Sequence, residues 1–203
     1  MKELFVKRLN LISLVLIVIV SIVILLNFLS LDLPLSGDLA ISQLGVLEST
    51  TKTFLILMML FWLGNFLYFI SLGYKLKVWD NKVGKAVLVS GGIAGVMIAL
   101  TGVFRYNISP IGHYFFSILY FGLFLLIIIY LGNFFKTFSK SYFYSSITIA
   151  TIIIIEFAIF MSSEKFLPLS EIIAVTLLLV WCLITEYLIS HSQPALDKKP
   201  TKI

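Results

Sequence analysis

Charged residues are scarce in this chain. Only 12% of its 203 residues are Asp, Glu, Lys or Arg, whereas 60% are hydrophobic. An average soluble domain is about 25% charged, so this sequence has too little polar surface to cover a globular core in water. The same figures exclude disorder, because 15% of the residues are aromatic. The composition therefore predicts an integral membrane protein.

Cysteine and histidine are nearly absent. Cys182 is the single cysteine, which excludes an intramolecular disulfide and a CxxC zinc site. The two histidines, His113 and His191, are far apart in the sequence, which argues against a histidine-rich metal centre. The sequence also contains no GxSxG, HExxH or phosphate-binding glycine loop. We therefore expect no metal and no cofactor.

Long apolar runs dominate what remains. A transmembrane helix needs about 20 mostly apolar residues. Six runs meet this requirement, at residues 11–31, 54–73, 86–104, 113–135, 143–162 and 171–189. The sequence thus predicts an all-α integral membrane protein, a single domain over residues 1–203 built as a bundle of six transmembrane helices. We expect residues 190–203 to form a disordered basic tail.

The basic residues indicate an orientation. Twelve of the fifteen Lys and Arg lie on one side if the N-terminus is cytoplasmic. This asymmetry follows the positive-inside rule and predicts cytoplasmic N- and C-termini, in a multi-pass protein of the plasma membrane. The formal charge of +5 is explained by the same bias, so we expect no nucleic acid among the partners. Membrane lipids are the expected partners, and a protein partner or a homo-oligomer stays open.

Two features predict structural roles. The third run carries small residues at helical spacing, Gly91, Gly95, Ala99 and Gly102. Such a stripe favours close packing between helices, so we expect the third helix to be central. Glu186 lies near the cytoplasmic end of the last run, where an inner-loop lysine such as Lys75 or Lys136 is the expected ion-pair partner.

Polar residues gather in the predicted outer leaflet. Glu156 lies several residues below the outer end of the fifth run, where an ionisable group is costly unless it faces the bundle interior. His113, Ser117 and Tyr120 follow helical steps of four and three along one face of the fourth run, and Arg105 ends the third run at the same level. These five residues predict a polar pocket suited to a phosphate or sugar-like headgroup through arginine.

The first outer loop, residues 32–53, is the longest connection and is a second source of functional residues. We expect Ser42 and Glu48 to contribute to the same pocket. If the protein is an enzyme, the candidate catalytic residues are His113, Glu156 and Glu48. Three hypotheses stay open: a lipid-binding protein, an intramembrane lipid-modifying enzyme, and a small proton-coupled transporter in which Glu156 titrates.

Three groups of short motifs run along the chain. They are Ile41-Ser42-Gln43-Leu44-Gly45 with Glu48 and Phe54; Gly102-Val103-Phe104 with His113-Tyr114, Phe121-Gly122 and Tyr130; and Cys182 with Glu186-Tyr187. With the six spans and the long first outer loop, they resemble the Frag/DRAM/Sfk family of six-span membrane proteins, in its distant prokaryotic branch. Gln43 departs from that family's pattern, which has Asp there.

The resemblance implies a function connected with lipids. Members of the family include a lipid-remodelling factor for glycosylphosphatidylinositol anchors, autophagy modulators and regulators of phosphoinositide signalling, and no catalytic residue set is settled for them. Matching positions in this chain are Ser42, Gly45, Glu48, His113 and Glu186. The expectation for this chain is the handling or sensing of lipids, with enzymatic activity left open.

Overall fold

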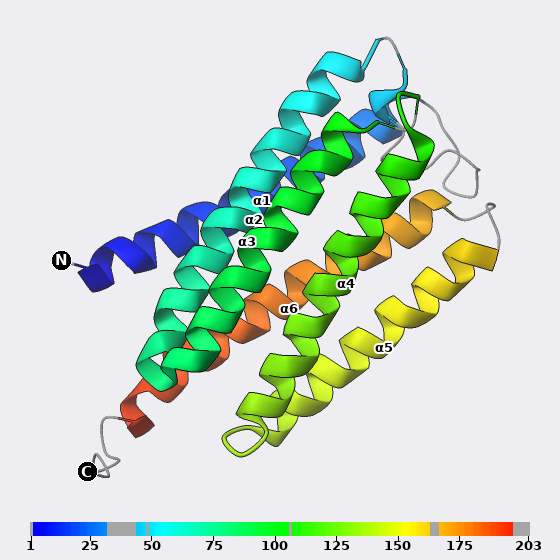
Figure 1. Ribbon diagram of the computed structural model, residues 1–203. Coiled ribbons are helices and arrows are strands. Elements are labelled where there is room, and N and C mark those ends of the chain that lie inside the picture. The colour runs from blue at the N-terminus through cyan, green and yellow to red at the C-terminus, as the bar shows by residue number, and fades with distance from the viewer. Residues whose placement is uncertain (1, 32–43, 48, 106, 163–166, 197–203) are drawn as a thin grey trace.

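The chain forms six long α-helices. A computed structural model describes residues 2–31, 44–47, 49–105, 107–162 and 167–196. The helices, in chain order, are α1 (Lys2–Leu29), α2 (Thr51–Trp79), α3 (Asn81–Val103), α4 (Pro110–Phe135), α5 (Lys140–Ser162) and α6 (Leu167–Leu196) (Figure 1). No strand occurs in the described ranges, so the all-helical prediction holds there.

Each helix covers all or nearly all of its predicted apolar run and extends beyond it at one end or at both. The clearest case is the connection predicted between Lys75 and Lys85, which is helical on both sides of Asp80. Asp80 caps α3, because its carboxylate accepts hydrogen bonds from the backbone nitrogens of Lys82 at 2.7 Å and Val83 at 3.1 Å. Lysine is a good helix former, so a helix need not stop where its apolar run stops.

The last helix also runs further than predicted. Residues 190–196, expected to be disordered, are the final turns of α6. Tyr187 and His191 stabilise this extension, because their rings stack with centroids 4.1 Å apart and His191 Nδ1 donates to the Tyr187 carbonyl at 2.9 Å. The remaining part of the predicted tail, residues 197–203, lies outside the described residues.

Consecutive helices run antiparallel and pack against each other in chain order, from α1 on α2 to α5 on α6 (Figure 1). The start of α1 and the end of α6 lie at one end of the bundle, with the α2–α3 and α4–α5 connections, and we call this the termini end. The opposite end is called the far end. Helices α1 and α6 pack only sparsely against each other. The ring of helices is therefore weakest along this α1–α6 seam.

The glycine stripe of α3 packs against α2. A Cβ atom added at Gly91 would lie 2.2 Å from Phe69 Cγ, and one at Gly102 would lie 3.1 Å from Met58 Cβ. At Gly95 the distance to Phe66 would be 3.6 Å, an ordinary contact. The stripe thus lets two backbones approach closely, as predicted.

The most connected helix is α2 rather than α3, which corrects the expectation of a central third helix. Side chains link α2 to three other helices: Ser71 Oγ donates to the Val6 carbonyl of α1, Tyr120 of α4 donates to Asn65, and Lys75 pairs with Glu186 of α6. Helix α3 packs between α2 and α4. Small residues bring α3 close to one neighbour but offer no side chains that reach others.

The outside of the bundle is apolar. Large hydrophobic side chains are exposed along every helix, including Leu11 at 64%, Ile56 at 62% and Leu126 at 64% of their accessible surface. A soluble protein rarely exposes such extended apolar surface. Within the described ranges, six helices are long and apolar enough to cross a membrane. This arrangement fits a multi-pass membrane protein.

Candidate functional site

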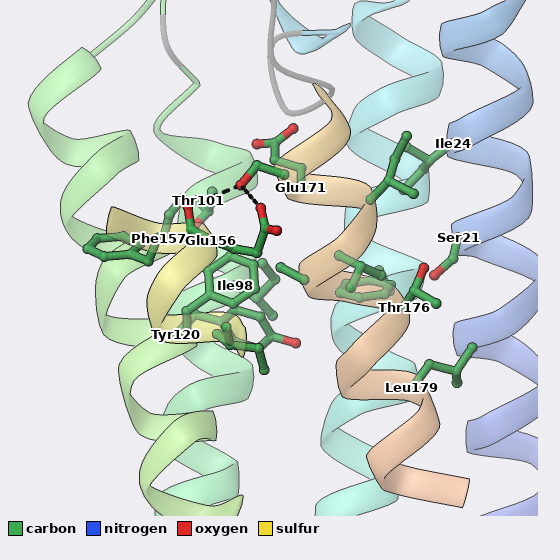
Figure 2. A pocket seen from close by; sticks show the side chains of 18 of the residues that line it. Ser21, Ile24, Ile98, Thr101, Tyr120, Glu156, Phe157, Glu171, Thr176 and Leu179 are labelled. Atoms are coloured by element: carbon green, nitrogen blue, oxygen red, sulfur yellow. Dashed lines mark hydrogen bonds between the residues drawn. The ribbon is translucent and has the colours of Figure 1, made fainter. Parts of the chain in front are cut away.

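A cavity of about 610 Å³ lies inside the far half of the bundle, between α4, α5 and α6 on one side and α1 on the other (Figure 2). All six helices contribute residues to its lining. Its volume is in the range of small-molecule binding sites. The cavity therefore provides space for a ligand among the helices of the bundle.

Polar side chains occupy the part of the cavity nearest the far end. His113 and Ser117 come from α4, Glu156 from α5, and Ser170 and Glu171 from α6. Since an α-helix rises about 1.5 Å per residue, His113 lies about 5 Å and Glu156 about 9 Å from the far end of its own helix. The structure thus brings His113, Ser117 and Glu156, which the sequence predicts to share a pocket, into one cavity lining.

Helix capping positions His113. Ser109 is the N-cap of α4, its Oγ accepts a hydrogen bond from the Gly112 nitrogen at 3.1 Å, and Pro110 begins the helix. This start places His113 in the first turn, where it is 97% buried against the end of α3. Its Nδ1 donates to the Thr101 carbonyl at 3.2 Å, because a carbonyl oxygen can only accept. The contact holds the ring in a fixed orientation at the cavity wall.

Glu156 joins α5 to α6. Its Oε2 accepts a hydrogen bond from Ser170 Oγ at 3.1 Å, and Ser170 Oγ also lies 3.3 Å from the Glu156 carbonyl (Figure 2). Among the described residues, Ser170 is the hydrogen-bond donor to this carboxylate, and it donates to Oε2 rather than to Oε1. The carboxylate is partly exposed to the cavity. Oε1 is therefore an acceptor that a ligand can use.

The deep part of the cavity offers a ligand mainly apolar surface. Tyr120 lines it, but its hydroxyl donates to Asn65 Oδ1 at 3.2 Å, and Asn65 Nδ2 donates to the Phe61 carbonyl at 2.9 Å. These polar atoms are consequently engaged within the protein. The other lining residues at this depth are mainly hydrophobic, among them Val18, Phe61, Leu125, Ile153 and Leu179. The cavity is thus amphipathic, polar near the far end and apolar toward the middle.

Arg105 is not among the residues that line the cavity. Its Nη1 donates to the Gly45 carbonyl at 3.1 Å, and the same carbonyl accepts from Thr51 Oγ1 at 2.9 Å. Arg105 thereby ties the segment before α2 to the end of α3. The other two predicted pocket residues, Ser42 and Glu48, lie outside the described residues.

Sequence reasoning missed Ser170, Glu171, Ser21 and Thr176 as lining residues. The predicted sixth run begins at residue 171, so Ser170 and Glu171 stand at its boundary in the sequence, whereas in the structure Ser170 hydrogen-bonds to Glu156 of the neighbouring helix. Comparing the depth of polar residues on consecutive helices would have found them. Ser21 interrupts a long run of aliphatic residues, which is a weaker signal.

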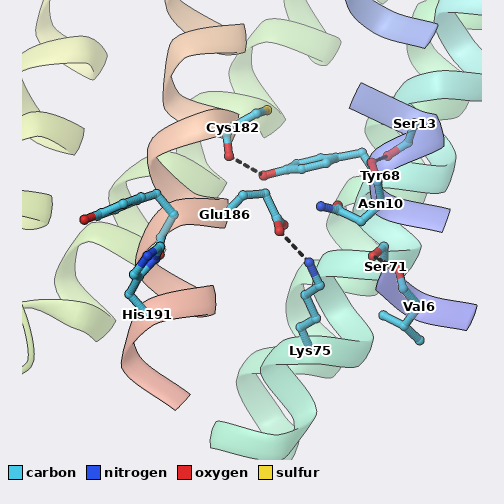
Figure 3. A network of polar contacts seen from close by, with 10 residues as sticks. Val6, Asn10, Ser13, Tyr68, Ser71, Lys75, Cys182, Glu186 and His191 are labelled. Atoms are coloured by element: carbon cyan, nitrogen blue, oxygen red, sulfur yellow. Dashed lines mark hydrogen bonds and ion pairs between the residues drawn. The ribbon is translucent and has the colours of Figure 1, made fainter. Parts of the chain in front are cut away.

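A second polar cluster lies near the termini end (Figure 3). Lys75 Nζ of α2 forms an ion pair with Glu186 Oε2 of α6, the pairing expected from the sequence. Above it, the Tyr68 hydroxyl donates to the Cys182 carbonyl at 3.3 Å. Glu186 Oε1 and Asn10 Oδ1 are buried without a hydrogen-bond partner among the described residues. The cluster fastens the second half of α6 to α2.

No family model matches the chain, and neither the curated proteins nor the solved structures contain a match. Within the described ranges, no group of three or more His, Cys, Asp or Glu residues is placed to hold a metal ion.

Proposed function

We propose that this protein is a multi-pass membrane protein with both termini on the cytoplasmic side, and that it binds a lipid in the amphipathic cavity. The single observation that carries the proposal is the cavity itself, with acceptors and donors at one end and hydrocarbon at the other. A lipid has the same division into a polar headgroup and an apolar chain.

The depth of the cavity supports this proposal. Val18 lies about 16 Å and Leu179 about 18 Å from the far ends of their helices, from a rise of about 1.5 Å per residue. The hydrocarbon core of a bilayer is about 30 Å thick. The cavity therefore spans about one leaflet, with its polar end at the level of the headgroups.

The charges support the orientation. Lys75, Lys77, Lys82, Lys85 and Lys136 lie at or near the termini end, beside the α2–α3 and α4–α5 connections. By the positive-inside rule this end faces the cytoplasm, so the cavity belongs to the outer leaflet. A function in handling or sensing lipids also agrees with the proposed relationship to the Frag/DRAM/Sfk family.

Two glycines allow a direct test. Gly122 lines the cavity and Gly92 of α3 is not among its lining residues, yet an added Cβ meets no atom within 4 Å at either position. Gly122→Phe should place its ring in the open space beside Gly122 and so reduce the cavity volume, and Gly92→Phe is the matched control. Wild type and both variants are reconstituted in nanodiscs of mixed bacterial-type phospholipids, and native mass spectrometry measures the lipid that each retains.

We expect wild type and Gly92→Phe to retain a lipid that Gly122→Phe loses. A second comparison uses His113→Ala combined with Glu156→Gln, which should weaken retention by removing polar groups at the cavity wall. Equal retention by wild type, Gly122→Phe and the double variant would show that lipids bind elsewhere, and the proposal would be wrong.

A further inference from the structure

The charged side chains that line the cavity are acidic. The lining contains two carboxylates, Glu156 and Glu171, and among the described lining residues none is Lys or Arg. Arg105, the residue expected to bind a phosphate, donates instead to the Gly45 carbonyl. The described lining therefore lacks the positively charged side chains that a site for an anionic headgroup would use.

We propose that the ligand is a lipid with a positively charged amine in its headgroup, and that the amine binds at Glu156. This inference rests on the proposed function and names the class of lipid. An ammonium group carries hydrogen-bond donors and no acceptor, which matches the Glu156 Oε1 acceptor. Ser170 holds the other carboxylate oxygen at 3.1 Å, so the carboxylate is oriented before the ligand binds.

The surroundings strengthen the pairing. Glu156 lies among apolar residues of α5, including Ile153, Ile154 and Phe157, which also line the cavity. An ion pair shielded from water is stronger than one at a surface, because the local dielectric is low. A carboxylate at the cavity wall also disfavours an anionic headgroup through repulsion between like charges. The hydrocarbon chain of the lipid would occupy the deep part of the cavity beside Tyr120 and Leu179.

Ligands with one chain and different polar ends separate these contributions. Dodecylammonium, dodecanol and dodecanoate share the same chain, and ethylammonium carries the amine without a long tail. Binding to the protein purified in a neutral maltoside detergent is measured by concentration-dependent thermal stabilisation. The variants are Glu156→Gln, Gly122→Phe and, as the control, Asp80→Asn, which removes a carboxylate at the termini end and keeps a residue suited to capping α3.

For wild type and Asp80→Asn we expect dodecylammonium to bind at least about tenfold more tightly than dodecanol, with dodecanoate weakest and ethylammonium ineffective. Glu156→Gln should reduce this preference to less than about twofold while dodecanol binding is retained. Stabilisation by ethylammonium equal to that by dodecylammonium would indicate a site for free amines and contradict a lipid ligand.

Two other outcomes separate this inference from the proposed function. Equal affinity of wild type for dodecylammonium and dodecanol, both abolished by Gly122→Phe, would overturn the headgroup assignment and leave the lipid cavity intact. This comparison uses wild type, so it holds even if Glu156→Gln fails to fold. Binding that is unaffected by Gly122→Phe, or no binding of any ligand, would contradict the cavity as a lipid site.

Discussion

At the residue scale, Lys75 and Glu186 form an ion pair in which each side chain neutralises the charge of the other. Both side chains are nearly buried, at 12% and 11% exposure. Glu186→Gln leaves the lysine charge in the bundle without its counter-charge, which typically costs about 3 to 5 kcal/mol of stability. We expect this loss in unfolding titrations with a denaturing detergent.

Replacing both charges is the informative comparison. Lys75→Met combined with Glu186→Met removes the pair without stranding a charge, and should recover most of the stability lost by Glu186→Gln. Lys77→Met is the control, because Lys77 contacts the Tyr74 ring but has no carboxylate partner among the described residues. Similar destabilisation by Glu186→Gln and Lys77→Met would show that the pair contributes little.

Arg105 is a residue whose expected and observed surroundings differ. Since its guanidinium donates to the Gly45 carbonyl, Arg105→Ala should loosen the segment before α2 without changing ligand affinity. Hydrogen exchange of the peptide covering residues 44–54 is expected to become faster, and dodecylammonium affinity should stay within about twofold of wild type. A large loss of affinity with unchanged exchange would instead place Arg105 in the binding site.

At the scale of elements, adjacent glycines of α3 differ sharply in their surroundings. A Cβ at Gly91 would lie 2.2 Å from Phe69 Cγ, whereas one at Gly92 meets nothing within 4 Å. Gly91→Ala should therefore destabilise the protein by about 1 to 3 kcal/mol through overpacking. Gly92→Ala should be neutral or slightly stabilising, because alanine favours helix by up to about 1 kcal/mol. Thermal unfolding of the two variants in one detergent tests this contrast.

The helices themselves could be predicted from the sequence, because long apolar runs and a glycine stripe depend on local spacing. The ends of the helices were harder to predict, and the break between α2 and α3 at Asp80 is an example. A run of lysines ends an apolar segment but not a helix, and the break comes instead from a capping side chain that accepts from Lys82 and Val83. The extension of α6 likewise involves a side-chain contact, the stacking of His191 on Tyr187, that no apolar run indicates.

At the scale of the whole molecule, the sequence predicted residues for the site but not its enclosure. Helical spacing grouped His113, Ser117 and Tyr120 correctly on one face, because those residues share a helix. That residues of all six helices line the cavity depends on which helices meet across the bundle, and short-range periodicity carries no such information. The contact of Arg105 could not be predicted for the same reason, since its partner Gly45 is 60 residues away.

If the cavity binds a lipid as proposed, the sparsely packed seam between α1 and α6 is the route by which we expect the lipid to enter. Ser21 of α1 and Thr176 of α6 both line the cavity, and Figure 2 shows both side chains in the region between these helices. The second half of α6 is fastened by Lys75 of α2, by the hydrogen bond between Tyr142 and Thr185, and by Trp181. Separation along the seam is therefore expected in the first half of α6.

Linking the seam should slow lipid exchange without changing lipid affinity. Ser21→Cys with Thr176→Cys, in a Cys182→Ala background, is joined by thiol reagents of increasing length, and release of a fluorescent amine lipid into excess unlabelled lipid is timed. A closed route lowers the rates of binding and release together, so the equilibrium constant should be preserved and the original rate should return on reduction. The single-cysteine variants are controls for the reagents. Unchanged release from the linked protein would place the route elsewhere, whereas a lost affinity would mean that the link deforms the cavity.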